Sequence, residues 1–217
     1  MYTLVAQSHM QISKHSQSCL IVKDQGKVVL LDPGSYTVEE HALDLNQLPQ
    51  LDAIGITHDH QDHLDIALLK QILKKFPNTS IFSNTSVKDL LAKENITVTI
   101  TNNDYISMTD VPHEKIWMGP SPQNSMITLF NRFTTVGDSL TFTSSAEILA
   151  LPIQAPWGST TAAVEKALEV MPKIIIPIHD FQWKDEVRIS MYDRLEEYFK
   201  QHKITFLKPL NGQEFEV

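Results

Sequence analysis

The chain has 217 residues, of which 42% are hydrophobic and 20% charged, and its formal net charge is -8. This composition is typical of a globular protein, and the negative charge argues against a nucleic-acid surface, which needs clustered lysine and arginine. The single cysteine, Cys19, excludes an intrachain disulfide and a thiolate-rich zinc site, and the absence of a signal-peptide pattern or a long apolar run predicts a cytoplasmic protein.

The first part of the chain alternates between apolar strand-like runs and segments with helical spacing. A turn signal, Gln25-Gly26, separates two of the strands and predicts a hairpin. Asp65 is a good N-cap for the first helix. The predicted strands cover 2–7, 18–24, 27–33, 51–56 and 78–82, and the predicted helices cover 66–76 and 86–95.

The middle of the chain is rich in strand-like runs, and the last third returns to alternation. The middle strands are expected over 96–100, 104–109, 114–119, 125–130, 132–137 and 140–144. The last third is expected to contain strands over 146–153, 173–179 and 203–209, and helices over 160–171 and 186–202. No linker rich in Gly, Pro or Ser divides the chain, so we expect one domain over 1–217, an α/β fold in which two sheets edged by helices form a four-layer sandwich.

The segment "HDHQDH" (58–63) begins one residue after the predicted strand at 51–56. Imidazole is the commonest metal ligand, and carboxylate is a harder partner. His58 and His60 are two positions apart and face the same way in an extended or tightly turned loop, whereas the neighbours Asp62 and His63 diverge. One short loop therefore offers two ligands to each of two metal ions. A chance polar loop is the alternative.

Four side chains do not complete two coordination spheres, so further ligands must come from elsewhere in the chain. The candidates end predicted strands, where side chains reach the edge of a sheet. His113 follows "DVP", Asp138 follows "FTTVG", and His179 ends "KIIIPI".

The order His58-x-His60-x-Asp62-His63, then His113, Asp138 and His179, resembles the metallo-β-lactamase-fold hydrolase superfamily. The segment "VVLLDPG" resembles that superfamily's first motif and places Asp32 at a strand end. Within the superfamily, the chain most resembles the branch typified by ascorbate-6-phosphate lactonase, because it shares the "H-S…LDPG" opening and the "IPIH" close of that branch. The resemblance implies an αββα sandwich with the metal ions at one edge between the sheets. It also implies this ligand set: His58, His60 and His113 for one ion, Asp62, His63 and His179 for the other, and Asp138 between them.

The resemblance further implies a metal-dependent hydrolase in which hydroxide bound by two divalent ions attacks a small metabolite. The expected substrate is an ester, a lactone or a phosphorylated sugar-like compound. The resemblance also implies that Asp62, besides being a metal ligand, accepts a proton during the reaction. A phosphodiesterase or nuclease of the same fold is one alternative, and a non-hydrolytic redox or metal-binding protein is another. Zinc is the first choice of metal, with manganese or iron open. The expected partner is a small molecule rather than a membrane or nucleic acid, and a homo-oligomer stays open.

Four other residues have two readings each. Asp32 either orients a ligand histidine from outside the coordination sphere or is a turn residue. Asp180 either orients a ligand histidine in the same way or is a plain exposed acid. Trp157 and Trp183 flank ligand-bearing segments and either line a pocket or pack in the core.

Overall fold

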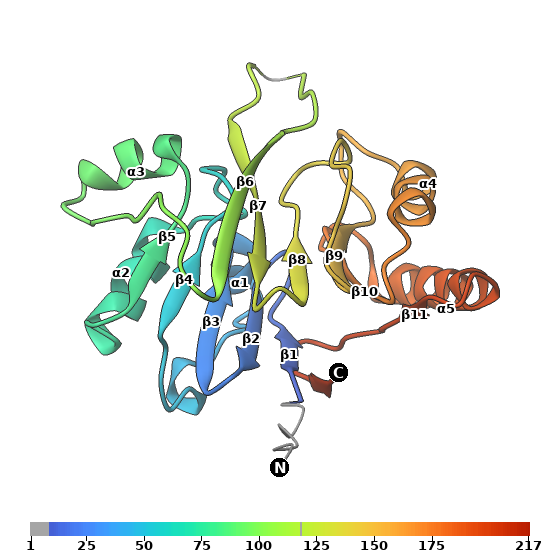
Figure 1. The fold of residues 1–217 in the computed structure, drawn as a ribbon, viewed down its shortest axis with the longest axis horizontal. Helices are drawn as coiled ribbons and strands as arrows, with labels where there is room; N and C mark the ends of the chain where they lie inside the picture. Colours follow the sequence, from blue (N-terminus) through green and yellow to red (C-terminus); the bar gives the residue numbers. More distant parts are fainter. Residues whose placement is uncertain (1–8, 118) are drawn as a thin grey trace, which may run out of the picture.

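Two six-stranded sheets face each other and helices cover their outer faces, so the protein is a four-layer α/β sandwich (Figure 1). The computed structural model describes residues 9–117 and 119–217, and the strand expected over 2–7 lies outside them. The predicted architecture is confirmed. Across the described residues, no helix is both long and apolar enough to cross a bilayer.

The first sheet has the strand order β12-β1-β2-β3-β4-β5. Its strands are β1 (Gln11–Lys14), β2 (Leu20–Asp24), β3 (Lys27–Leu31), β4 (Ala53–Gly55), β5 (Ser80–Phe82) and β12 (Glu214–Glu216). The predicted hairpin is present as β2 and β3, which pair antiparallel, whereas β3, β4 and β5 run parallel.

The second sheet has the order β11-β10-β9-β8-β7-β6. Its strands are β6 (Ile106–Pro112), β7 (Gln123–Leu129), β8 (Phe133–Thr135), β9 (Ile148–Pro152), β10 (Ile174–Ile178) and β11 (Thr205–Phe206). Strands β8 to β11 run parallel, while β6 and β7 form an antiparallel edge.

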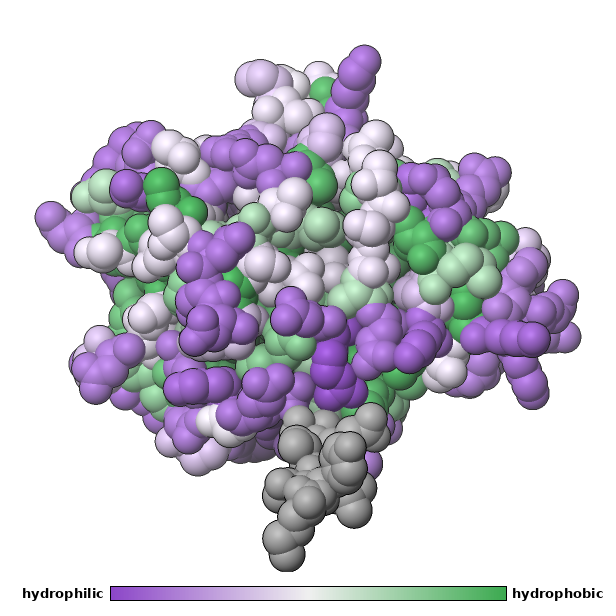
Figure 2. Space-filling model, viewed as in Figure 1, coloured by the Kyte–Doolittle hydropathy of each residue, from purple (hydrophilic) through white to green (hydrophobic). Residues whose placement is uncertain are grey.

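Helices α2 and α3 lie on the outer side of the first sheet, and α4 and α5 lie on the outer side of the second (Figure 1). The helices are α1 (Ser35–Glu39), η1 (Leu45–Gln47), α2 (Ile66–Lys75), α3 (Thr85–Ala92), α4 (Thr160–Val170) and α5 (Asp185–Gln201). As predicted, the Asp65 side chain caps α2, accepting a hydrogen bond from the Leu68 N–H at 2.7 Å. Helix α5 buries Tyr192, Leu195 and Phe199, and its outer surface is mostly hydrophilic (Figure 2).

The side chains of β3 show why the strands read as unbroken apolar runs. Successive side chains of a strand point to opposite faces. Val29 and Leu31 therefore join the core between the two sheets, while Val28 and Leu30 join the core under α2 and α3. Both faces of this strand are buried, which is usual for strands in a parallel arrangement.

Three of the strands expected in the middle of the chain are loops. Segment 96–100 makes only an isolated bridge, between Thr99 and Phe82. The described part of 114–119 is irregular, because Pro120 and Pro122 follow it and cannot donate to a ladder. Segment 140–144 is held by side chains instead, since the Leu140 N–H donates to the Glu114 carboxylate at 2.9 Å.

The carboxyl ends of the parallel strands meet at one edge of the sandwich. Asp32 follows β3, the loop 57–63 follows β4, Asp138 lies shortly after β8, and His179 follows β10 directly. His113 follows β6 at the end of the antiparallel edge pair. This edge is where ligands bind in open α/β sheets.

Candidate metal centre

The loop after β4 folds as a tight turn that gathers histidines and aspartates at the buried edge of the sheets. The His63 and Leu64 N–H groups both donate to the His60 carbonyl, at 3.0 and 2.9 Å. His58 and His63 are fully buried, whereas His60 and Asp62 are half-buried and line a cavity. The turn therefore presents its side chains from one short stretch of backbone in two directions.

The first group of candidate ligands consists of three imidazoles. The Nδ1 atom of His60 lies 3.2 Å from Nε2 of His58 and 3.3 Å from Nε2 of His113. The remaining nitrogens have partners that favour this arrangement: Nδ1 of His113 donates to the Glu114 carbonyl at 2.6 Å, and Nδ1 of His58 lies 3.0 Å from the Thr57 hydroxyl. Three ring nitrogens are thus left facing one point.

The second group brings the other half of the loop to the end of β10. Nε2 of His63 lies 3.0 Å from Nε2 of His179 and 3.6 Å from a carboxylate oxygen of Asp62. His179 has a φ of 64°, in the left-handed region that residues with a side chain seldom adopt. This turn of the backbone directly after the strand sets the ring at the cluster.

The Asp138 carboxylate lies between the two groups. Its Oδ1 atom is 3.0 Å from Nε2 of His63 and 2.6 Å from Nε2 of His179. Its Oδ2 atom is 3.3 Å from Nε2 of His113 and 3.8 Å from Nε2 of His58. The indole N–H of Trp157 donates to the same Oδ2 at 2.9 Å. One oxygen therefore faces each group, which is the placement of a bridging ligand.

The spacing and chemistry of the cluster suit two divalent cations. Adjacent nitrogens in a tetrahedral zinc shell with bonds of about 2.0–2.1 Å lie about 3.3 Å apart, and the distances in the first group are 3.2 and 3.3 Å. Within each group the ligand atoms all lie within 4.8 Å of one another. Asp138 Oδ1 is buried, and its close neighbours at 2.6 and 3.0 Å are Nε2 of His179 and of His63, neither of which makes a well-oriented hydrogen bond to it. This oxygen is therefore available as an acceptor for a cation.

Charge within the cluster is strongly coupled. Burial, and next the neighbouring His63, hold the pKa of His58 well below its usual value. Burial opposes the charge of Asp138, yet His179, His63 and His58 outweigh it and hold the pKa of that carboxyl well below its usual range. Burial likewise disfavours protonated His63, but Asp138, Asp62 and Asp32 raise its pKa well above the ordinary value. A carboxylate that stays ionised among imidazoles provides the charge that a cation needs.

Asp32 lies behind His63, on the side away from the other ligands. Its Oδ2 atom is 2.9 Å from Nδ1 of His63 and accepts from the Thr57 hydroxyl at 2.9 Å, while its Oδ1 accepts from the Thr57 N–H at 2.8 Å. Its backbone φ is 43°, so it is also a turn residue, as the Pro-Gly that follows predicts.

Gly34 has to lack a side chain, because a Cβ there would lie 1.9 Å from the Asp62 carbonyl oxygen.

Replacing Asp32 by asparagine is expected to weaken binding of the ion at His63. Asparagine tolerates the left-handed backbone, but its side chain has only one acceptor oxygen. Its NH₂ group must therefore face either the Nδ1–H of His63 or the Thr57 N–H, which places two donors against each other. We expect a loss of about 10–100-fold in affinity for one ion, since outer partners of ligands have effects of that size. Chelator competition measures it, with Asp52→Asn, a distant acid bonded to the Val28 N–H, as the control. Unchanged affinity would contradict the orienting role.

Gln17 belongs to the site, although nothing in the sequence marked it. It lies in the turn between β1 and β2 with a φ of 46°. Its amide nitrogen lies 3.1 Å from the Asp62 carboxylate and 3.1 Å from Nδ1 of His179, and its oxygen accepts from the Phe181 N–H at 3.2 Å. Gln17 therefore links two ligands of the second group that come from different sheets.

Two residues proposed for the surroundings of the site have other contacts. Asp180 is buried, and it pairs with the buried Lys14 ammonium and accepts from the Tyr192 hydroxyl. It is therefore neither an exposed acid nor a direct partner of a ligand histidine. Trp183 packs against the core under α4 and α5, whereas Trp157 lines the cavity at the cluster. The difference arises because Trp183 lies past the end of β10, where the chain turns towards α5.

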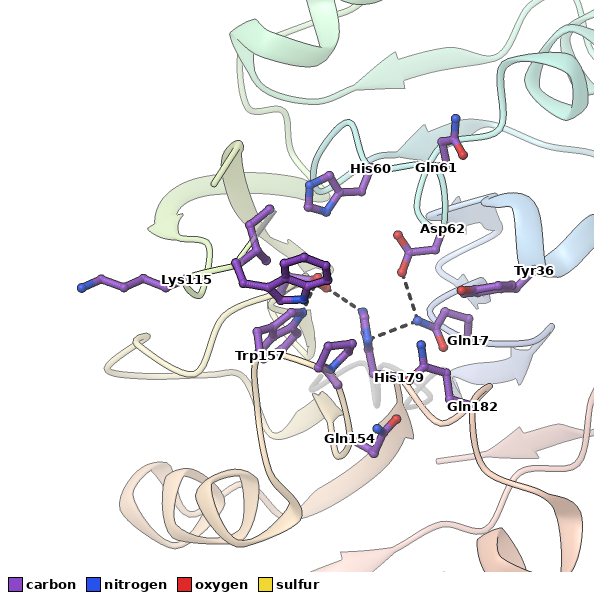
Figure 3. Close-up of a pocket in the computed structure, with 15 residues that line it drawn as sticks. Gln17, Tyr36, His60, Gln61, Asp62, Lys115, Gln154, Trp157, His179 and Gln182 are labelled. Carbon is purple, nitrogen blue, oxygen red and sulfur yellow. Dashed lines mark hydrogen bonds and ion pairs between the residues drawn. The ribbon is translucent and has the colours of Figure 1, made fainter. Parts of the chain in front are cut away.

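The seven residues singled out in the sequence thus lie together, and their role as metal ligands stays a prediction. The cluster forms the floor of a cavity of about 330 Å³, with Asp62, Asp138 and His179 in its lining (Figure 3). This volume lies at the lower end of the range for small-molecule sites. A cluster suited to divalent ions, open to a small cavity, is an arrangement in which a bound molecule reaches the ions directly.

Comparisons with known proteins agree with this architecture. A family profile described as "Beta-lactamase superfamily domain" matches residues 11–179. Protein Rv0786c of Mycobacterium tuberculosis is 26% identical over 206 residues, covering 87% of this chain and 92% of that protein. Igni18, described as a metallo hydrolase from Ignicoccus hospitalis, has a TM-score of 0.69 at 15% identity, covering 96% of this chain and 98% of its own. The metallo-beta-lactamase fold protein YhfI from Bacillus subtilis has a TM-score of 0.67 at 16% identity, covering 97% and 100%.

Proposed function

This chain belongs to the beta-lactamase superfamily, and from that premise we propose that it is a hydrolase of a small-molecule ester or lactone that depends on two divalent metal ions. The observation that carries the proposal is the position of Asp138, with one oxygen toward His63 and His179 and the other toward His113 and His58. A carboxylate placed in this way is suited to hold two ions close together at the floor of a cavity.

The protein's own groups have distinct tasks in this proposal. When bound, the ions supply Lewis acidity toward the scissile bond and activate water near neutral pH. The imidazoles His58, His60 and His113 would hold one ion, and Asp62, His63 and His179 would hold the other. The Trp157 N–H fixes the Asp138 carboxylate through Oδ2, and the Asp32 carboxylate keeps Nε2 of His63 free for a metal.

Asp62 is the proposed proton acceptor. Its side chain is 24% exposed, whereas the Asp138 side chain is 3% exposed, so Asp62 is the carboxylate of the cluster with the better access to the cavity. Gln17 donates to its Oδ2 and holds it in place at 3.1 Å. A carboxylate held in this way can take a proton from water and return it to the leaving group.

A hydrolysis panel on metal-loaded protein tests the proposal. The panel contains lactones, 4-nitrophenyl esters, a thioester, nitrocefin and bis(4-nitrophenyl) phosphate. We expect turnover of esters or lactones that disappears on chelation and returns when zinc, manganese or iron is added, since the bond cleavage depends on the ions. Turnover of the phosphate diester alone would favour the phosphodiesterase alternative. A loaded protein that hydrolyses no member of the panel would contradict the hydrolase proposal.

Zinc is the proposed resident ion, because five imidazoles and two carboxylates form a donor set that zinc accepts readily. A cytoplasmic location is likewise proposed.

A further inference from the structure

The cavity above the cluster differs in chemical character from the cluster itself. Two of its walls come from different parts of the fold: one includes Gln17 and Tyr36, and the other includes the loops around Trp117 and Trp157. Figure 3 shows Tyr36 on one side of the cavity and Trp157 on the other, with Asp62 and His179 between them. A molecule whose reacting bond lies at the cluster would therefore place its remaining parts against these walls.

The walls carry almost no charge. Among the described residues that line the cavity, the acids are Asp62 and Asp138, both in the cluster, and the one lysine or arginine is Lys115. Lys115 is exposed, and its ammonium points away from Asp62 and His179 (Figure 3). The other polar groups are neutral: the Tyr36 hydroxyl and the amides of Gln17, Gln61, Gln154 and Gln182. An anionic group on the substrate, away from the reacting bond, would thus have no cation beside it in the interior of the cavity, since Lys115 points outward.

The aromatic walls are held in fixed orientations. The Trp157 indole donates to Asp138 and meets the rings of His179 and His113 edge-on, with centroids 5.5 and 6.2 Å apart. Tyr36 stacks on Phe181 at a centroid distance of 3.8 Å. Both rings are thereby restrained before a ligand enters, which lowers the entropy lost on binding.

Trp117 has no comparable support. It is 85% exposed, although it lines the cavity. An indole left almost fully in water at the rim of a cavity loses that exposure when a planar or aliphatic group lies against it.

We propose that the cavity selects an uncharged ester or lactone with a planar or apolar group, bound between Tyr36 and Trp157 and covered by Trp117. Compounds with an anionic group away from the scissile bond, phosphorylated sugars included, are discriminated against. The reason is that an anion placed against these uncharged walls loses part of its hydration and gains no cationic partner there in return. The ester and lactone chemistry of this inference rests on the function proposed above.

Two matched pairs of compounds test the inference. The substrates are 4-nitrophenyl butyrate and 4-nitrophenyl 3-sulfopropanoate, which share one ester and differ in a terminal methyl or sulfonate. The second pair, 4-nitrophenyl butyl ether and 3-(4-nitrophenoxy)propane-1-sulfonate, is not hydrolysed and reports binding alone. Sulfonate is chosen because it is a poor metal ligand. With metal-loaded protein, we expect kcat/KM to be at least about tenfold higher for the neutral ester than for its sulfonate. We expect the neutral ether to bind at least about tenfold tighter than its sulfonate.

The two pairs separate this inference from the hydrolase proposal. If neither of these esters nor any member of the panel is hydrolysed but the neutral ether binds at least about tenfold tighter, the hydrolase proposal fails and the selectivity of the cavity stands. Equal or tighter binding of the sulfonate, or no binding of either ether, overturns the inference even if esters are hydrolysed.

A variant at the rim tests the role of Trp117. Trp117→Ala is expected to weaken binding of the neutral ether by about 2–12-fold, the range for loss of one aromatic contact, while Trp117→Phe retains most of it. Because Trp117 is 85% exposed, neither change disturbs the fold. Equal binding by wild type and Trp117→Ala overturns the assignment of this residue to the substrate.

Discussion

Asp138→Ala is expected to remove both metal ions and lower kcat/KM by at least about a thousandfold. Its two oxygens face the two halves of the cluster, so the substitution takes one ligand from each. It also removes the negative charge that raises the pKa of His63 and of His113, which leaves the imidazoles without their shared anion. Metal content by elemental analysis and turnover on the best substrate of the panel measure the two effects.

Thermal unfolding gives an independent readout of the same variant. Ions that bind only the folded protein raise its melting temperature, so the wild type should be stabilised by added metal and Asp138→Ala should not. The matched control is Asp110→Ala, an acid on β6 whose side chain is bonded to Gln123 and Ser125. If Asp138→Ala keeps two ions and the metal-dependent stabilisation, Asp138 is not the bridge between the two groups.

Asp62→Asn is expected to lower kcat by about 10²–10⁴-fold, the range for loss of a positioned proton acceptor, while the ions are retained at saturating metal. Asparagine keeps an oxygen that can act as a ligand but cannot accept a proton at neutral pH. Single-turnover kinetics with metal content determined on the same sample separates the chemical step from loss of an ion.

The control for Asp62 lies in the same loop. Asp59 accepts a hydrogen bond from the Ser86 hydroxyl at 2.7 Å and is not part of either ligand group. Asp59→Asn should therefore leave turnover within about twofold, since it removes no interaction made in the transition state. Equal turnover for Asp62→Asn and the wild type would exclude Asp62 as the proton acceptor.

The convergence of the seven side chains could be expected from the sequence because each lies shortly after a strand-like run. Chain segments that run parallel in a sheet end at the same edge, so residues just past their ends meet there, as those after β4, β8 and β10 do. The spacing within "HDHQDH" added the local part of the arrangement. These features depend on periodicity and order along the chain, which a sequence shows directly.

The residues around the cluster could not be found in the same way. Gln17 is neutral, lies in a turn, and reaches His179 across 162 positions of sequence. Asp180 was interpreted as either an outer partner of a ligand histidine or an exposed acid, yet Lys14 and Tyr192 enclose it. The left-handed backbone of Asp32 and His179, which sets both side chains, has no marker in the sequence because neither residue is a glycine. Such features depend on tertiary contacts that no local pattern encodes.

Two strands of the first sheet, β12 at its edge and β1 beside it, were missed for a related reason. β1 and β12 come from opposite ends of the chain and pair with each other, so each is stabilised by a partner that its own sequence does not reveal.

Segments 114–119 and 140–144 have apolar residues typical of strands. Because Glu114 binds the Leu140 N–H and the Thr141 hydroxyl instead, the described part of the first segment and the whole of the second form loops at the site. The family branch predicted from the "H-S…LDPG" and "IPIH" segments stays a prediction.

Anomalous diffraction from crystals of metal-loaded protein, recorded on both sides of the absorption edge of the ion, tests the central claim most directly. Two peaks per chain are predicted, one among His58, His60 and His113 and the other among Asp62, His63 and His179, with the Asp138 carboxylate between them. No peak at the cluster after reconstitution, or a single ion bound elsewhere on the protein, would contradict the account.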